Sequence, residues 1–253
     1  MKSAVFISVR DKATRLPGKI YADLGGRPAI ERLVQRMRTC TEPDLVVVCT
    51  STHPDDRRLL ETAERCGVTS FAGSEDDKLD RYLRAAERLD VDFAAIVDGD
   101  DLFCDPGYTD RIIREHRTSG GDYVIVDGLP LGATAFGVAI KALRAVCERK
   151  DESDTEVWGA YFTGRPGFDV RLLAPDPRDR RPDLRMTLDY PEDYAFFTAV
   201  YEALSPTDPV PSLRRIIEYC EGHPDIAALN QGAQERYEAH LREAAPVRMR
   251  EAT

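Results

Sequence analysis

The chain has 253 residues, enough for one large α/β domain or two small ones. Its formal net charge of −10 argues against a general nucleic-acid binder, which needs an excess of Lys and Arg. No run of about 18 apolar residues is present, so we expect no membrane-spanning helix and no membrane partner. No signal-peptide pattern precedes the first predicted strand. The six cysteines form no Cys-x-x-Cys pair and are expected to be reduced thiols in a cytoplasmic protein.

In the first half of the chain, strand-like apolar runs alternate with helical patterns. This alternation is typical of βαβ units and predicts a mostly parallel sheet. The predicted strands lie at 4–9, 45–49, 68–71 and 93–97, and the predicted helices at 30–39, 54–66, 79–89 and 109–116. In the less regular second half, we expect strands at 123–126, 134–140, 170–173 and 184–188, and helices at 141–150, 192–204, 212–221 and 231–244. The Pro-rich stretch 205–211 is interpreted as a connection, not as an interdomain linker.

The loop after the first predicted strand carries three cations, Arg10, Arg15 and Lys19, with a Pro-Gly turn between the second and the third. A guanidinium offers a planar fork to phosphate oxygens, and an ammonium offers a compact point charge. The spacing matches neither a P-loop nor a dinucleotide-binding glycine motif. A solvated basic turn is the plain alternative. The position at a strand end, together with the acidic clusters below, favours a site for a polyanion such as a triphosphate.

Two acidic clusters follow predicted strands. Asp98-Gly99-Asp100-Asp101 comes directly after the strand at 93–97, where ligands of open α/β sheets bind. Mg²⁺ takes one or two carboxylates plus phosphate oxygens, so this cluster suits a metal, although a plain turn fits equally well. Asp189 follows the predicted strand at 184–188 and is the candidate second metal ligand. Glu192 and Asp193 are expected instead to favour the N-terminus of the following helix.

A third polar loop spans 73–77 and leads into Asp80 and Arg81. Ser74 suits either a helix cap or a nucleotide contact, and Arg81 either an ion pair or a contact with a base. On residue type alone, the structural interpretation is favoured for both. Trp158 and Tyr161 are expected to lie in the core or at an interface.

Taken together, these motifs resemble the cytidylyltransferase family, and most closely its spore-coat polysaccharide group. That family also includes enzymes that activate 3-deoxy-manno-octulosonate and acylneuraminates. The hallmark is Arg10 followed by Ala13-Thr14-Arg15-Leu16-Pro17-Gly18-Lys19, and order and spacing hold over about 1–204 and more weakly to Asn230. The chain departs from the family at Asp11-Lys12 and at 153–161, where a His common in relatives is missing. The further matching motifs are Leu24-Gly25-Gly26-Arg27-Pro28, Gly73-Ser74-Glu75-Asp76-Asp77, Leu79-Asp80-Arg81-Tyr82, Asp98-Gly99-Asp100 and Leu188-Asp189-Tyr190-Pro191-Glu192-Asp193.

The resemblance implies one Rossmann-like three-layer α/β/α domain with a mostly parallel mixed sheet, usually as a homodimer. We expect a catalytic core at 1–204 and a helical extension at 205–253. The resemblance also implies CTP as the nucleotide and Mg²⁺ as the metal. The residue roles that it implies are triphosphate binding by Arg10, Arg15 and Lys19, metal binding by Asp100 and Asp189, contacts near the nucleoside by Ser74 and Arg81, and a place near the base or metal for Asp98. Arg10, Lys19 and Asp100 are the expected catalytic residues.

The resulting hypothesis is Mg²⁺-dependent transfer of CMP from CTP to an acceptor oxygen, with release of pyrophosphate. The expected acceptor is small and anionic: an acidic sugar, a sugar or polyol phosphate, or a phosphonate. Candidate acceptor contacts lie in 128–136 and 154–161, and Arg165 or Arg185 suits either an acidic acceptor or the surface. Two alternatives stay open. One is a metal-dependent glycosyltransferase that uses Asp98-Gly99-Asp100, and the other is a non-catalytic nucleotide-binding relative.

Overall fold

The computed structural model describes residues 1–12, 15–151, 158–163, 166–243 and 247–250. Within these residues, seven strands form one sheet in the order β3-β2-β1-β4-β6-β5-β7. β6 runs antiparallel to both of its neighbours, and the other pairings are parallel. The predicted mostly parallel, mixed sheet is therefore confirmed. The strands are β1 (Ser3–Ser8), β2 (Leu45–Ser51), β3 (Thr69–Gly73), β4 (Phe93–Asp98), β5 (Tyr123–Val126), β6 (Phe136–Ala139) and β7 (Val170–Leu173).

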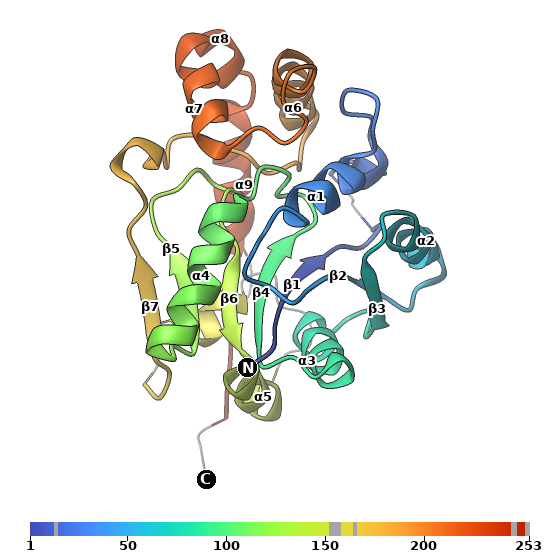
Figure 1. Ribbon diagram of the computed structural model, residues 1–253, viewed down its shortest axis with the longest axis vertical. Coiled ribbons are helices and arrows are strands. Elements are labelled where there is room, and N and C mark those ends of the chain that lie inside the picture. Colours follow the sequence, from blue (N-terminus) through green and yellow to red (C-terminus); the bar gives the residue numbers. More distant parts are fainter. Residues whose placement is uncertain (13–14, 152–157, 164–165, 244–246, 251–253) are drawn as a thin grey trace.

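Helices cover both faces of this sheet (Figure 1). On β6, Phe136 contacts Trp158, whose ring also contacts Tyr82 of α3. The next residue, Gly137, faces Ile112 of α4. Because successive side chains of a strand point to opposite faces, α3 and α4 lie on opposite sides of the sheet, which gives the predicted three layers. The helices are α1 (Ala29–Met37), α2 (Arg57–Arg65), α3 (Lys78–Leu89), α4 (Pro106–Ser119), α5 (Ile140–Arg149), α6 (Pro191–Leu204), α7 (Leu213–Gly222), α8 (Pro224–Ala227) and α9 (Gln231–Glu243).

The predicted strand at 184–188 is wrong. This segment has one isolated bridge, between Leu131 and Arg185, and otherwise runs as a loop. Its backbone pairs with two other loops: Met186 N donates to Leu131 O at 2.7 Å, and Leu188 N donates to Asp100 O at 2.9 Å. The apolar alternation is real, but it buries the segment against loops rather than in the sheet. Two smaller differences are the short helix α8, which the pattern did not predict, and β6, which is shortened because Ile140 already begins α5.

One hydrophobic core extends from the sheet into the C-terminal helices. Leu213, Ile216 and Ile217 of α7 belong to the same buried cluster as the side chains of β1 and β4. Trp158 and Tyr161 are also buried in it, as expected. The boundary at residue 204 stays a prediction. All six cysteines carry free thiols, and no helix in the described part of the chain is long and apolar enough to cross a membrane.

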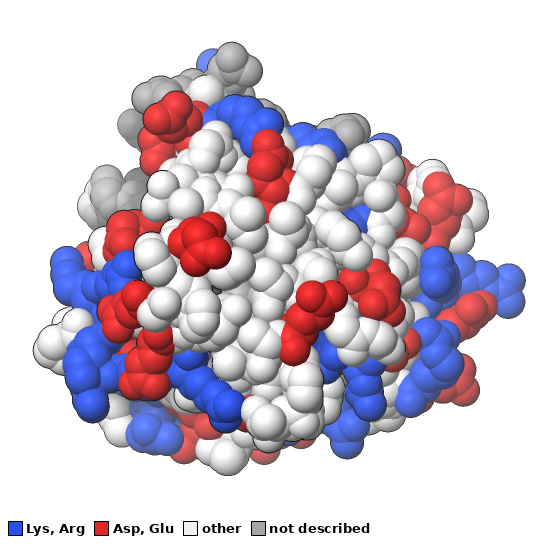
Figure 2. Space-filling view, turned by 90° about the horizontal axis from the view of Figure 1, so that it is seen from above, with Lys and Arg blue, Asp and Glu red and all other residues white. Residues whose placement is uncertain are grey.

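On the face of the molecule that Figure 2 shows, the acidic residues are dispersed. This view looks onto the end of the molecule that carries α6, α7 and α8. Uncharged residues fill most of its centre, separate carboxylates interrupt them, and Lys and Arg lie mainly toward the rim. On this face the charge of the chain therefore creates no single acidic or basic patch.

Gly99 joins β4 to the loop that carries the first acidic cluster. Its amide donates to Ser8 O at 2.8 Å, which extends the pairing of β1 and β4 by one residue. A Cβ atom at this position would lie 2.6 Å from the Cβ of Val9. We predict that Gly99→Ala lowers the free energy of unfolding by about 1–3 kcal/mol, because one of the two strand ends must move.

Chemical denaturation of the purified variant would measure this loss. The control is Gly222→Ala, where nothing lies within 4 Å of the new methyl group. An equal stability of the Gly99→Ala variant and the wild type would contradict the close packing of these two strand ends.

Candidate active site

A cleft of about 1070 Å³ opens at the carboxyl ends of β1 and β4. Its walls come from the loop after β1, the loop after β4, the segment 128–132 and the short helix η3 (Trp158–Tyr161). Cations and carboxyl groups are nearly balanced in the described lining of the cleft, whereas the whole chain carries a net charge of −10. The cleft is therefore richer in cations than the chain as a whole. The cations are Arg10, Lys12, Arg15, Lys19, Lys78 and Arg81, and the carboxyl groups are Asp98, Asp100, Asp101, Asp127 and Asp189.

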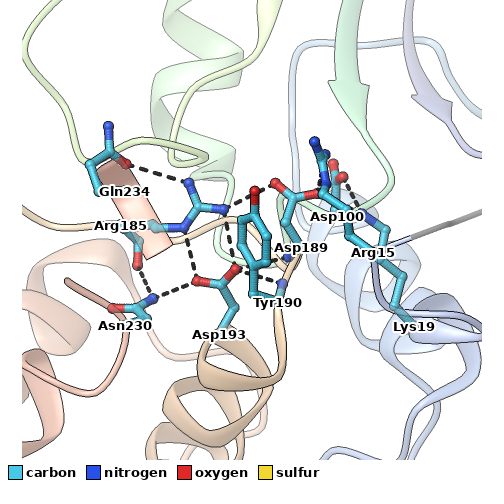
Figure 3. Close-up of polar contacts among 9 residues, drawn as sticks. All are labelled: Arg15, Lys19, Asp100, Arg185, Asp189, Tyr190, Asp193, Asn230 and Gln234. Carbon is cyan, nitrogen blue, oxygen red and sulfur yellow. Dashed lines mark hydrogen bonds and ion pairs between the residues drawn. The ribbon is translucent and has the colours of Figure 1, made fainter. Parts of the chain in front are cut away.

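The structure brings Arg15 and Lys19 onto the predicted metal carboxylates (Figure 3). Lys19 Nζ lies 2.6 Å from Asp100 Oδ2 and 3.0 Å from Asp189 Oδ1, and Arg15 Nη2 lies 2.9 Å from the same Asp189 oxygen. Gly18, with φ at 69°, makes the left-handed turn that directs the chain into η1 (Lys19–Tyr21). Arg10 also lines the cleft, but its Nη1 donates to Glu75 O at 2.6 Å. Ala13 and Thr14 of the hallmark lie outside the described residues.

Asp189 is a buried carboxylate that stays ionised. It is 2% exposed, and burial alone would raise its pKa. Lys19 and Arg15 outweigh burial and hold the pKa of Asp189 below its ordinary value. Burial likewise would lower the pKa of Lys19, but Asp100 and Asp189 outweigh it and raise that pKa. The ammonium and the carboxylate are therefore both charged near neutral pH.

Arg185 holds Asp189 from the side opposite the cleft. Its Nη2 donates to Asp189 Oδ2 at 3.0 Å, and its Nε donates to Asp193 Oδ1 at 2.9 Å. Asp193 also accepts the amides of Asp189 and Tyr190, so it caps α6 as expected and in addition anchors Arg185. Arg185 is 4% exposed and is not among the described residues that line the cleft, so it is neither a surface charge nor placed as an acceptor contact. The other candidate, Arg165, lies outside the described residues.

Asp98 faces a cation that the sequence analysis missed. Lys78 Nζ lies 3.7 Å from Asp98 Oδ1, and both side chains line the cleft. Burial raises the pKa of Asp98, and Lys78 opposes that rise. Lys78 begins α3 after Asp77, which caps the helix by accepting the amide of Asp80. The available signal was its place at the start of a helix that follows a polar loop.

Arg81 and Ser74, the two residues expected near the nucleoside, have different places in the structure. Arg81 is 1% exposed and lines the cleft; its Nη1 donates to Ser74 O at 3.2 Å, while its buried Nε has no hydrogen-bond partner in the described structure. Burial lowers the pKa of Arg81. Ser74 is not among the described lining residues, and its hydroxyl accepts the amide of Asp77 at 3.0 Å. The structure thus places Arg81 in the cleft and Ser74 in a local turn.

The donor set fits a metal that is shared with a phosphate ligand. Asp100 and Asp189 come from distant parts of the chain and converge on one ammonium. In the described part of the chain, no cluster of three or more His, Cys, Asp or Glu could hold a metal by protein ligands alone. Two carboxylates completed by phosphate oxygens and water are typical of Mg²⁺ and do not suit a structural zinc site.

The opposite wall of the cleft is largely apolar. Tyr123, Phe136 and Trp158 contribute aromatic surface, and the segment 128–132 forms the rim beside them. Gly132, with φ at 85°, sits so close to Met186 O that a Cβ atom would lie 2.4 Å away. The acceptor segment predicted at 128–136 therefore does border the cleft. Of the second predicted segment, 154–161, residues 154–157 lie outside the described residues, whereas Gly159 and Ala160 line the wall.

Comparison with known proteins decides between the candidate families. A cytidylyltransferase family model matches residues 4–152. The chain belongs to the cytidylyltransferase family. It is therefore a nucleotidyltransferase, and the reaction class of its family is cytidylyl transfer.

Two relatives show how far the likeness extends. The enzyme is 29% identical over 232 residues to the spore coat polysaccharide biosynthesis protein SpsF of Bacillus subtilis (strain 168), which covers 87% of this chain and 95% of that protein. It is 34% identical over 114 residues to the 3-deoxy-manno-octulosonate cytidylyltransferase of Anaeromyxobacter sp. (strain Fw109-5), a match of 44% of this chain and 45% of that one.

Solved structures share the fold. A cytidylyltransferase from Leptospira borgpetersenii superimposes with a TM-score of 0.82 at 22% identity and covers 90% of this chain and 97% of its own. A CMP:2-keto-3-deoxy-manno-octonic acid synthetase complexed with CTP gives a TM-score of 0.64 at 13% identity, with coverages of 80% and 99%. Both matches confirm the Rossmann-like α/β architecture of the enzyme.

We predict that Lys19→Met destabilises the enzyme by about 3 kcal/mol at pH 7, because it leaves Asp100 and Asp189 facing each other without their shared cation. Because the pKa of Asp189 is lower in the folded enzyme, its ionisation stabilises the fold fully at pH values above its unfolded-state pKa. This stabilisation is lost as the pH falls through the folded-state pKa. Because the pKa of Lys19 is higher in the folded enzyme, its protonation stabilises the fold fully at pH values below its unfolded-state pKa. This stabilisation is lost as the pH rises through the folded-state pKa. The loss is therefore largest between about pH 4 and about pH 10.

Urea denaturation of wild type and variant across this pH range would measure the difference. Lys12→Met is the control, since Lys12 is two-thirds exposed and its ion pair with Glu75 lies at the surface. A deficit that is the same at pH 3.5 and at pH 7 would contradict the electrostatic role of Lys19.

Proposed function

We propose that the enzyme transfers CMP from CTP to an oxygen of a small anionic acceptor, releases pyrophosphate, and requires Mg²⁺. The observation that carries this proposal is the meeting of Lys19 with Asp100 and Asp189 at the carboxyl ends of β1 and β4. The cations proposed to hold the triphosphate and the two carboxylates proposed to hold the metal line one cleft there. Family membership supplies the reaction class.

The proposed step is an in-line displacement at phosphorus. The acceptor oxygen attacks the α-phosphorus of CTP, the bond from that phosphorus to the bridging oxygen of the β-phosphate breaks, and pyrophosphate leaves with the electron pair. A phosphate or phosphonate oxygen attacks as the anion, whereas a sugar hydroxyl gives up its proton to water. Asp100 and Asp189 would hold Mg²⁺, which would neutralise charge on the triphosphate. Arg10, Arg15 and Lys19 stabilise the departing pyrophosphate, because preorganised cations act best where negative charge develops.

The cations of the loop have to exchange partners when the nucleotide binds. Arg15 and Lys19 now neutralise carboxylates, and both sit in the cleft that the triphosphate enters. Their buried ion pairs keep the side chains extended into the cleft, so less conformational entropy is lost on binding. Arg81, whose Nε has no hydrogen-bond partner in the described structure, is the proposed contact near the nucleoside. Ser74 shapes the loop, and Asp98 is proposed to lie near the base or the metal.

The acceptor is proposed to lie against the wall formed by 128–136 and η3. Tyr123, Phe136 and Trp158 suit the carbon skeleton of a sugar or polyol. Lys78 is the nearby cation that suits an acidic, phosphate or phosphonate group, since its partner Asp98 is 3.7 Å away and the pair is loose. The homodimer stays a prediction.

We predict that Asp100→Ala lowers kcat by about a hundredfold or more, the loss of roughly 3 kcal/mol expected for one preorganised electrostatic group. Pyrophosphate release from CTP and Mg²⁺ would be followed with a panel of acidic sugars, polyol phosphates and phosphonates. The control is Lys141→Ala, which removes an exposed cation of α5 that is not among the described residues lining the cleft, and it should keep normal turnover.

Near-normal turnover of the Asp100→Ala variant would contradict the site. Hydrolysis of a nucleotide-sugar without pyrophosphate release would favour a glycosyltransferase instead. Binding of CTP without turnover of any acceptor in the panel would favour a non-catalytic nucleotide-binding role.

A further inference from the structure

The two oxygens of Asp189 have different surroundings. Oδ1 accepts Arg15 and Lys19 from the cleft, and Oδ2 accepts Arg185 from the protein interior (Figure 3). Because a carboxylate is planar, a fixed Oδ2 determines the direction in which Oδ1 points. The geometry of the metal-facing oxygen therefore depends on how firmly Arg185 is held.

Arg185 is held by more than its two carboxylates. Its guanidinium forms a forked pair with Asp193, through Nε to Oδ1 at 2.9 Å and through Nη2 to Oδ2 at 3.1 Å. On the other side, its Nη1 faces Gln234 Oε1 at 3.4 Å, and its Cζ lies 4.9 Å from the ring centre of Tyr237. A guanidinium that is stacked and forked in this way has little freedom to turn.

The C-terminal segment provides the remaining support. Asn230 is 2% exposed, and its Nδ2 donates to Asp193 Oδ1 at 2.9 Å and to Arg185 O at 3.1 Å. Asn230, Gln234 and Tyr237 are spaced by four and three residues, so they share one face at the start of α9. We call these three residues the α9 clamp. The family model ends at residue 152, so both Asp189 and its whole support lie beyond the matched part of the chain.

We propose that the α9 clamp is a positioning element of the active site, which holds Arg185 so that Asp189 presents Oδ1 to the metal bound with the nucleotide. The inference rests on the proposed function, because it assigns a role toward the metal of that site. It gives the C-terminal helices a part in catalysis through Asp189. Asn230 is a positioning residue, since it is not among the described residues that line the cleft and acts through Asp193 and Arg185.

If the clamp positions Asp189, its loss should change the affinity for metal and leave the metal-free affinity for CTP nearly unchanged. Without metal, the nucleotide is expected to bind through the cations of the loop. Tyr237 of the clamp also lines the cleft, but the described hydrogen bonds of Asn230 and Gln234 go to residues other than these cations. With metal, binding also needs a correctly oriented Asp189. Loss of the clamp should therefore weaken metal binding by about tenfold or more, as is typical when the support of a metal ligand is removed, and leave the metal-free affinity for CTP within about twofold.

The test uses the full chain and Mn²⁺ as the probe, titrated with and without CTP and followed by its paramagnetic resonance signal. Metal-free CTP affinity is measured in parallel by calorimetry. The variants are Asn230→Ala, Arg185→Lys and, should Asn230→Ala fail to fold, Gln234→Ala. Glu235→Ala is the matched control, because Glu235 is an exposed neighbour on α9 outside the clamp.

A weaker affinity for Mn²⁺ with an unchanged metal-free affinity for CTP in the clamp variants, and normal values in Glu235→Ala, is the expected result. Unchanged Mn²⁺ binding in Asn230→Ala and Arg185→Lys would overturn the inference and leave the proposed function standing. Equal losses of both affinities would also overturn it, since they indicate a general collapse of the cleft. Absence of both Mn²⁺ and CTP binding in the wild type would overturn the proposed function, and the inference with it.

Discussion

The ionised carboxylate of Asp189 is the point at which the distant parts of this enzyme meet. The N-terminal loop reaches it through Arg15 and Lys19, the end of β4 reaches it through Asp100 and the shared ammonium, and the C-terminal half reaches it through Arg185. A buried charge of this kind is tolerated only when it is paired on every side. The site therefore cannot form until segments about 170 residues apart have docked, which couples the completion of the fold to the assembly of the cleft.

The sheet determines where that meeting takes place. β1 lies inside the sheet, with β2 on one side and the central strand β4 on the other, so the connections from β1 and β4 leave in different directions and open a crevice at their carboxyl ends. Gly99 lets the two strand ends approach each other, and Leu188 N binds Asp100 O, which brings Asp189 beside the acidic loop. The reversed strand β6 and the residue Trp158 then supply the apolar wall across from the charges.

The sequence predicts the parts of the site that are encoded locally. Arg15, Lys19 and Asp100 lie in connections that follow true strands, and their place after those strands brings them to one edge of the sheet. Asp189 reaches the same edge on a loop, although the sequence placed it there through a strand that the structure does not contain. The strand at 184–188 was wrong because alternating apolar residues report burial on one face, and they do not report which backbone is the partner. Here the partners were the loops at Leu131 and Asp100.

Other parts of the site are encoded only by tertiary contacts. Arg185 is a single arginine in the sequence, and nothing local distinguishes it from a surface charge until Asp193 and Asn230 surround it. Arg81 Nε, which has no hydrogen-bond partner in the described structure, and the approach of Lys78 to Asp98 likewise depend on how α3 packs against the sheet. The spacing of Arg185, Asp189 and Asp193, each four residues apart, was the one signal of this network in the sequence.

Calorimetric titration of the wild-type enzyme with CTP, UTP, ATP and GTP, each with and without Mg²⁺, tests the central claim most directly. If the cleft is a cytidylyl-transfer site, CTP binds more tightly than the other triphosphates, and Mg²⁺ increases its affinity. Absence of binding by any triphosphate, or an affinity that Mg²⁺ leaves unchanged, would contradict the joint roles assigned to the Arg10–Lys19 loop and the two carboxylates.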